Sequence, residues 1–191
     1  MLKRWARDGS RCTRTEYKVN PAPSRPSFIV ATADVEPAAF YYPDSTEPHG
    51  PRRAIGKAAG LVKIGLHVTV VPPGTRVSRP HAEEREEEFA FVLEGEVDAW
   101  IDGHLHRVRA GDLIAFPSGT GICHTFINNG SEDARVLVGG EATRDDNRIY
   151  YPLDADRRHQ IAEHEWWSDV LLGPQGPHDG LPDALRAPWP L

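Results

Sequence analysis

The sequence predicts an all-β fold, and three observations support this prediction. Short apolar runs follow one another from residue 61 to residue 141, and turn residues separate them at near-regular intervals. The first of these runs, residues 61–71, alternates apolar and polar positions, as a strand with one buried face does. The 191 residues include 17 Gly and 17 Pro, a combined share above the usual value of about 12%. Many short strands at this spacing indicate a sandwich or a barrel.

Residues that favour turns bound each expected strand. Pro72-Pro73-Gly74 ends the strand of residues 61–71. Asp102-Gly103 predicts a tight hairpin, because glycine readily adopts the positive φ that such a turn needs. The further strands are expected at residues 88–94, 97–102, 105–108, 112–116, 122–128 and 134–140.

The two flanks of this barrel, which we place at residues 61–141, lack the regular pattern. Residues 1–60 are expected to form an arm that packs on the barrel, with a short strand at 28–33, and their many prolines exclude a long helix. Residues 142–191 are expected to form an irregular C-terminal extension. Within that extension we expect an edge strand at 147–151 and a short helix at 154–167.

Composition excludes several classes of protein. The formal net charge is −6, and basic residues form no block, so nucleic acid is not an expected partner. No apolar run approaches 18 residues, so no membrane span is expected. Cys12 and Cys123 are too few for a disulfide framework and suit a reducing compartment. With no secretory signal at its start, the chain is expected to be a cytoplasmic protein.

The residues with the most evident chemistry lie between the first two expected strands and near the end of the barrel. His81 and Glu83 share parity, so on a strand both side chains face the same way. Glu88 opens the next apolar run, and His124 lies inside the expected strand 122–128. Imidazole nitrogen and carboxylate oxygen together suit Fe, Mn, Ni or Zn. These four residues are therefore candidate ligands of one divalent transition metal.

These residues also carry a resemblance to the cupin family. Cupins have a first motif G(x)5HxH(x)3–4E(x)6G, and here Gly74, His81, Glu83, Glu88 and Gly95 occupy its positions, with six residues in place of five after the first glycine. The spacing of six residues between the glutamate and the last glycine is kept. The residues around that glycine, Phe-Val-Leu-Glu-Gly-Glu, are typical of the family.

The second cupin motif, G(x)5PxG(x)2H(x)3N, is matched further along the chain. Gly111, Pro117, Gly119, His124 and Asn128 occupy its positions, with four residues in place of two before the histidine. The resemblance covers about residues 61–141. Beyond the barrel, a Tyr-Tyr-Pro segment at residues 150–152 is similar to that of one subgroup of single-domain cupins.

The resemblance implies a double-stranded β-helix, which is a jelly-roll barrel, and a metal held inside it. Carried over residue by residue, the ligands are His81, the position of Glu83, Glu88 and His124. Glu83 departs from the family pattern, in which this position is a second histidine. Either the centre is a harder, more negative site with two histidines and two glutamates, or the change marks a cupin that has lost its metal.

Other histidines have weaker claims to a role. His67 shares a face with polar residues on the expected strand 61–71, so it is a candidate acid/base group at the barrel mouth, beside Glu88 as the other candidate catalytic residue. His104 and His106 repeat the His-x-His spacing, but they follow a hairpin turn, where solvent exposure is expected.

Two functions fit these residues. The first is a metal-dependent enzyme that acts on a small polar molecule inside the barrel, as an isomerase, a decarboxylase or other lyase, or a dioxygenase. The alternative is a non-catalytic module that binds a sugar or an organic acid, with a structural metal or none. In either case the expected partners are a small-molecule ligand and a second copy of the chain, since small barrels with exposed edges often pair as homodimers.

Overall fold

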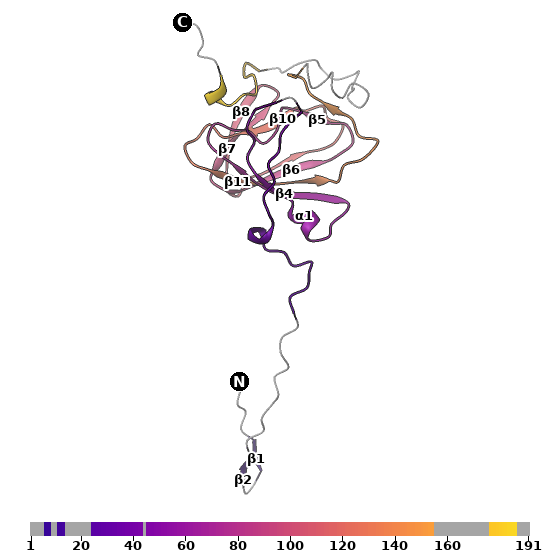
Figure 1. The fold of residues 1–191 in the computed structure, drawn as a ribbon, viewed down its shortest axis with the longest axis vertical. Coiled ribbons are helices and arrows are strands. Elements are labelled where there is room, and N and C mark those ends of the chain that lie inside the picture. The colour runs from indigo at the N-terminus through magenta and orange to yellow at the C-terminus, as the bar shows by residue number, and fades with distance from the viewer. Residues whose placement is uncertain (1–5, 9–10, 14–23, 44, 155–175, 187–191) are drawn as a thin grey trace.

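Two antiparallel sheets face each other in the computed structural model, which describes residues 6–8, 11–13, 24–43, 45–154 and 176–186 (Figure 1). The architecture is an all-β jelly roll of the cupin type, as predicted. Side chains from both sheets meet in one apolar core, whose fully buried members include Val92 and Val136 from the larger sheet and Val97 and Ala99 from the smaller one. The two sheets therefore close on each other as a barrel.

The larger sheet has five strands in the order β3-β4-β11-β6-β9. Each neighbouring pair is antiparallel, so the polypeptide crosses between the sheets several times to build it. In chain order the five strands are β3 (Arg52–Arg53), β4 (Ile64–Val71), β6 (Glu88–Glu94), β9 (Leu113–Phe116) and β11 (Ala134–Glu141).

The smaller sheet has the order β10-β7-β8, with β7 at Glu96–Ile101, β8 at His104–Arg109 and β10 at His124–Ile127. The free edge of β10 is covered by the extended segment 74–81, which makes isolated antiparallel bridges with it. That segment leads into β5 (Ala82–Glu83), and β5 pairs with β12 (Ile149–Tyr150).

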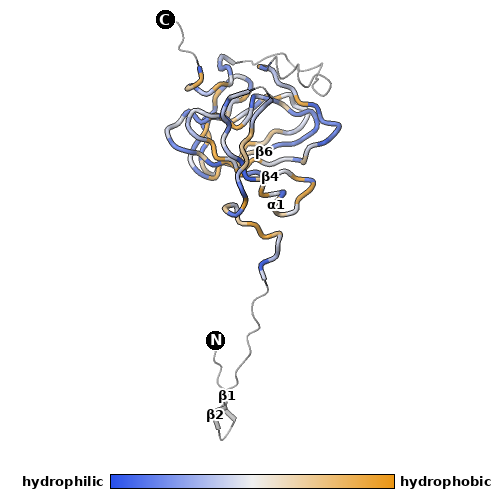
Figure 2. The backbone as a smooth tube through the Cα atoms, in the orientation of Figure 1, coloured by the Kyte–Doolittle hydropathy of each residue, from blue (hydrophilic) through white to orange (hydrophobic). Residues whose placement is uncertain are grey.

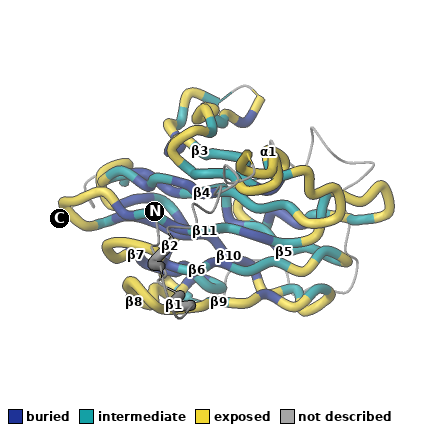
Figure 3. The backbone as a smooth tube through the Cα atoms, turned by 90° about the horizontal axis from the view of Figure 1, so that it is seen from below, coloured by how far each residue is buried: buried dark blue, intermediate teal, exposed yellow. Residues whose placement is uncertain are grey.

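Burial follows the alternation of side chains along the strands. Figure 2 shows hydrophobic and hydrophilic stretches alternating in the barrel, and Figure 3 shows burial concentrated in the middle of the strands with exposure at the loops. In β6, for example, Ala90 and Val92 are buried, whereas Leu93 is 38% exposed. A second cluster centred on the fully buried Trp100 packs beneath the segment that leads into β5.

The described residues confirm most of the expected strands and correct one. The strand predicted at 88–94 matches β6, and the other barrel strands agree within a few residues. Residues 28–33 are not a strand: a turn precedes a 3-10 helix, η1 (Thr32–Asp34), because no strand of the barrel lies beside this segment to pair with it. The expected helix at 154–167 falls outside the described residues, apart from its first position.

Four further elements complete the described fold. Strands β1 (Ala6–Asp8) and β2 (Arg11–Thr13) pair with each other. A single helical turn, α1 (Ile55–Ala58), lies against β4, and a 3-10 turn, η2 (Asp183–Leu185), belongs to the C-terminal segment. No helix in the described part of the chain has the length and apolar character needed to span a bilayer.

Arg76 connects the barrel to both flanks. Its guanidinium is buried and forms a bidentate pair with Glu47 of the N-terminal arm, at 2.5 and 2.7 Å. The same group donates a hydrogen bond of 2.6 Å to the carbonyl oxygen of Gly180 in the C-terminal segment. A buried charge is tolerated only when it is paired and fully hydrogen-bonded, so both flanks contribute to keeping this one in place.

Candidate metal centre

His81 and His124 are placed side by side by backbone pairing. The two residues form an antiparallel bridge in which each amide N–H donates to the other residue's carbonyl oxygen, at 3.2 and 2.9 Å. Their side chains consequently project to the same side, with ring centroids 5.0 Å apart. The sequence separation of more than forty residues is thus closed by two hydrogen bonds, and both imidazoles lie at the inner face of the barrel.

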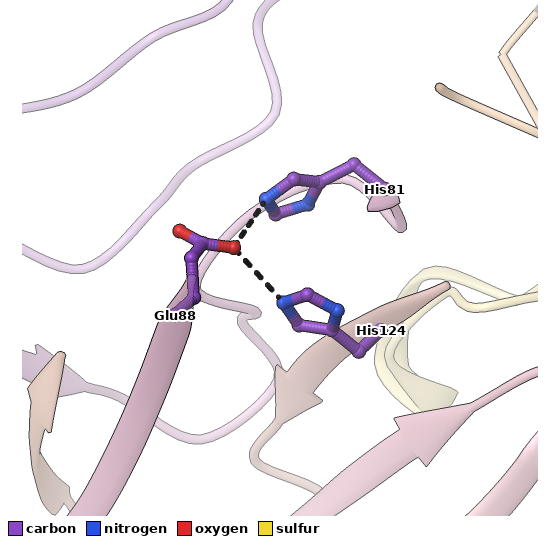
Figure 4. A group of neighbouring side chains, drawn as sticks. All are labelled: His81, Glu88 and His124. Atoms are coloured by element: carbon purple, nitrogen blue, oxygen red, sulfur yellow. Dashed lines mark hydrogen bonds and ion pairs between the residues drawn. The ribbon is translucent and has the colours of Figure 1, made fainter. Parts of the chain in front are cut away.

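Glu88 reaches the two imidazoles from the opposite sheet. It is the first residue of β6, and its Oε2 atom lies 3.2 Å from His124 Nε2 and 3.4 Å from His81 Nε2 (Figure 4). One ligand atom from each residue lies within 4.8 Å of the other two. Two imidazole nitrogens and one carboxylate oxygen therefore converge on a single point between the sheets.

The outer nitrogen of each imidazole is held by a backbone carbonyl. His81 Nδ1 donates to the carbonyl oxygen of Arg79 at 2.8 Å, and His124 Nδ1 donates to that of Ile122 at 3.3 Å. These carbonyls keep a proton on Nδ1, so loss of the Nε2 proton gives the tautomer a metal ligand needs, with the Nε2 lone pair facing the cluster. Phe116 stacks on the His124 ring at 3.5 Å, and Tyr151 stacks on His81 at 5.8 Å, so neither ring is free to turn.

The charges of the cluster are strongly coupled. Burial by itself lowers the pKa of His81, but the hydrogen bond and charge of Glu88, with a contribution from Glu83, raise it to about 9. Burial raises the pKa of Glu88, but hydrogen bonds from His124 and His81 outweigh it and hold this pKa well below its usual range. Burial lowers the pKa of His124 more than Glu88 raises it. Without a metal, a proton on His81 is therefore the positive charge that balances Glu88.

Glu83, the fourth expected ligand, lies beside the cluster and not within it. Its Oε1 atom is 3.9 Å from His81 Nε2, and its side chain is only 8% exposed. Asn147, two residues before β12, donates a hydrogen bond to Oε2. Burial raises the pKa of Glu83 to about 7, against the opposing charge of His81 and the bond from Asn147. Its role as a ligand remains a prediction.

A cavity of about 1100 Å³ lies against the cluster. Glu83, Glu88 and His67 all line it, so the other candidate catalytic histidine shares the cavity with the cluster. Sequence reasoning did not identify Asn147 or Arg52, which also line this cavity, because neither belongs to a motif. His104 and His106 are exposed on β8, as expected, and take no part in the cluster.

The residues present fit a divalent cation. Imidazole nitrogen with carboxylate oxygen is a donor set for Zn, Fe, Mn or Ni, and the two fixed tautomers aim their lone pairs at one point. His81, Glu88 and His124 would hold the ion. Glu83 is near enough to become a fourth ligand or to receive a hydrogen bond from a bound molecule.

Comparison with known families supports this interpretation of the fold. A family profile described as "Cupin domain" matches residues 67–140. Among curated proteins, the polyketide synthase CurC from Streptomyces cyaneus is 30% identical over 83 residues, which are 44% of this chain and 49% of CurC. The matches cover between about half and three fifths of the length of the curated relatives.

Solved structures with similar sequence share the barrel. A sugar phosphate isomerase of the cupin superfamily from Silicibacter pomeroyi is 28% identical, with a TM-score of 0.60 over 64% of this chain and 80% of that one. The polyketide cyclase RemF from Streptomyces resistomycificus is 25% identical, with a TM-score of 0.50 over 63% of this chain and 82% of its own. This chain thus has the jelly-roll fold in common with proteins that are named as enzymes.

Removal of one imidazole should abolish metal binding. We expect the untagged wild-type protein to retain close to one equivalent of Zn, Mn, Fe or Ni after dialysis, measured by plasma mass spectrometry, and His124→Ala to retain less than a tenth of that amount. His106→Ala removes an exposed imidazole of the second His-x-His sequence, and this variant should retain the wild-type metal content. Metal far below one equivalent in wild-type protein, whichever ion is supplied, would contradict the site.

Metal affinity should rise with pH between 7 and 9. The raised pKa of His81, about 9, means that this imidazole carries a proton at neutral pH, and a metal must displace it. We expect the association constant for Zn to increase about tenfold per pH unit and to level off above pH 9. Calorimetry in buffers of different ionisation enthalpy should show the release of about one proton at pH 7.5. An association constant that does not change from pH 7 to pH 9 would refute the proton on His81.

Proposed function

The chain belongs to the cupin superfamily, and on that basis we propose that it is a metal-dependent enzyme that removes a proton from the carbon beside a carbonyl group of a small polar substrate. The observation that carries the proposal is the position of Glu83. Its buried carboxyl lies beside the three side chains that would hold a metal, and it lines the same cavity as one of them, Glu88. A carboxylate next to an electrophilic centre is the arrangement that proton abstraction requires.

The similar proteins agree with this class of reaction. One is named as a sugar phosphate isomerase and another as a polyketide cyclase. Isomerisation of a sugar through an enediol and ring closure by an aldol step both begin when a proton leaves the carbon next to a carbonyl. We assign to this chain the removal of that proton, which both reactions share, and not the formation of either product. The isomerase and lyase classes expected from the sequence both include such reactions.

The chain's own residues have separate roles in this proposal. His81, Glu88 and His124 would hold a divalent cation, which would supply a Lewis acid for a carbonyl oxygen of the substrate. Glu83 takes the substrate proton on Oε1, the oxygen that faces His81, and later returns it. Asn147 occupies Oε2 and so fixes which oxygen is available. Glu88 binds both imidazoles through one oxygen, which favours a ligand role over the proton transfer expected for it.

Loss of the Glu83 carboxylate should stop proton exchange without emptying the metal site. We expect the metal-loaded wild-type protein to catalyse exchange of the proton beside the carbonyl for deuterium in D2O. The substrates are a panel of aldose phosphates, ketose phosphates and β-dicarbonyl compounds, followed by proton NMR. Glu83→Gln keeps the size of the side chain and an oxygen that can accept the hydrogen bond from Asn147, but it should lower the exchange rate by 10²- to 10⁴-fold.

Glu84→Gln is the matched control for this measurement. Glu84 is the next residue, and its carboxylate pairs with Arg148 at the surface. We expect this variant to retain both wild-type exchange and wild-type metal content. Metal loss in Glu83→Gln would assign Glu83 to the ligand set. Thermal stabilisation by a panel compound with no exchange would favour the alternative of a non-catalytic binding module.

We propose in addition that two copies of the chain associate through the outer face of the larger sheet. Three apolar side chains form a row across this face, since Phe91 lies opposite both Leu137 and Leu113 in the sheet register. Leu113, on the edge strand β9, is 63% exposed, and the neighbouring Leu93 is 38% exposed. Contiguous apolar surface of this kind favours an interface.

Light scattering coupled to size-exclusion chromatography tests the homodimer. We expect a mass near twice the chain mass of 21.2 kDa, and we expect Leu113→Lys to shift it toward a single chain because it places a charge in the interface. Lys63→Glu alters an exposed charge away from this row and should not change the mass. A single-chain mass for the wild-type protein at micromolar concentration would exclude the homodimer.

A further inference from the structure

A half-buried guanidinium with no anionic partner among the described residues lines the cavity that lies against the metal centre. Arg52, on β3, packs its guanidinium against the face of the Phe40 ring, 3.6 Å from the ring centroid. Its Nη2 atom is buried and has no hydrogen-bond partner among the described residues. No described carboxylate forms an ion pair with it, although arginine is normally paired when it is withdrawn from water.

The sheet register places Arg52 on the same face as the metal centre. Arg52 lies opposite Thr69 on β4, and Thr69 shares parity with His67. On β11, Val138 lies opposite both His67 of β4 and Ala90 of β6. Ala90 is two residues from Glu88, so these two side chains project to the same face of the sheet. Residues directly opposite each other in antiparallel strands project to one face of the sheet. Arg52, His67 and Glu88 therefore all project toward the interior, and all three line the same cavity.

Charge is divided between the two ends of this cavity. The carboxylates of Glu83, Glu86 and Glu88 lie on the side of the metal centre, and Glu141, Asp145 and the ion-paired Arg144 also line the cavity. The other end carries Arg52 and Lys57, and no ion pair to either is found in the described part of the chain. His67 lies between the two ends, and Arg52 is near enough to affect its ring electrostatically. One end thus suits a cation and the other an anion.

We infer that Arg52, with His67 and Lys57, binds an oxyanion group of the substrate, a carboxylate or a phosphate, at the end of the cavity away from the metal centre. A guanidinium held flat by an aromatic ring presents two parallel N–H groups, the geometry that a carboxylate or phosphate accepts. The inference rests on the proposed function, because it identifies the substrate of that same site.

The separation of the two ends limits the size of the substrate. His67 is two strands and two residues away from Glu88, which corresponds to roughly 12 Å between their Cα atoms. The oxyanion and the reacting carbonyl must therefore lie at different ends of one molecule. The substrate class is a carbonyl compound with a carboxylate or phosphate at the end away from the reacting carbonyl.

Titration of the metal-free protein with inorganic phosphate tests the inference directly. The full chain is kept in a chelator, and the histidine ring signals are followed by two-dimensional NMR. We expect the His67 signal to shift on addition of phosphate, with a dissociation constant that rises at least tenfold in Arg52→Met. Arg53→Met is the matched control: Arg53 is the next residue, its guanidinium is bonded to the carbonyl oxygen of Val35, and phosphate binding should change less than twofold.

One further variant and one further anion complete the experiment. Arg52→Lys keeps one charge but not the paired N–H groups, and an intermediate affinity in this variant supports the inference even where Arg52→Met folds poorly. Acetate in place of phosphate tells the two oxyanions apart: acetate binding assigns a carboxylate, and binding of phosphate alone assigns a phosphate. A wild-type His67 signal that neither anion moves, or equal affinities in wild type and Arg52→Lys, would overturn it. Because no metal and no turnover are involved, failure of the exchange reaction leaves this measurement unaffected.

Discussion

The backbone pairing of His81 with His124 is the constraint on which the functional interior depends. Two hydrogen bonds bring together residues from distant parts of the chain and set both imidazoles on one side. Glu88 completes the cluster from the other sheet, so the three donors converge only when the two sheets are closed. The site is thus a property of the whole barrel. No single loop or strand contains it, and the packing of Phe116 and Tyr151 on the rings fixes it further.

Electrostatics gives the same cluster a strong preference for a cation. Glu88 is withdrawn from water between two imidazoles, and a buried carboxylate needs a positive charge nearby. Without a metal, a proton on His81 supplies the positive charge beside Glu88. A divalent ion would supply a larger positive charge and would bind the Nε2 lone pairs of both imidazoles. Carbonyl oxygens that hold the Nδ1 protons prepare the imidazoles in advance for this exchange. The imidazoles therefore need little reorientation when a metal ion binds.

Local pattern and motif spacing were sufficient to predict the barrel strands and the three side chains that converge between the sheets. Alternation of apolar residues is a direct consequence of a strand with one buried face, so β6 was predicted with its observed bounds. The strand expected at 28–33 does not form, because β-propensity is realised only where a partner strand is available.

Arg52 and Asn147 were not predicted from the sequence, because only the long-range arrangement of the strands brings them to the cavity. Glu83 was recognised by motif position, but only the structure separates it from the ligand cluster.

The bidentate contact between Arg76 and Glu47, together with the bond to Gly180, has a consequence for how the polypeptide reaches its native state. One guanidinium joins an early segment, the middle of the barrel and a late segment, and it is withdrawn from solvent only when all three are assembled. Release of the Glu47 segment would leave the Arg76 charge without its ion pair, and release of the Gly180 segment would leave one of its N–H groups without an acceptor. The barrel and the described segments around Glu47 and Gly180 accordingly stabilise one another, and a change that loosens either segment also weakens the barrel at Arg76.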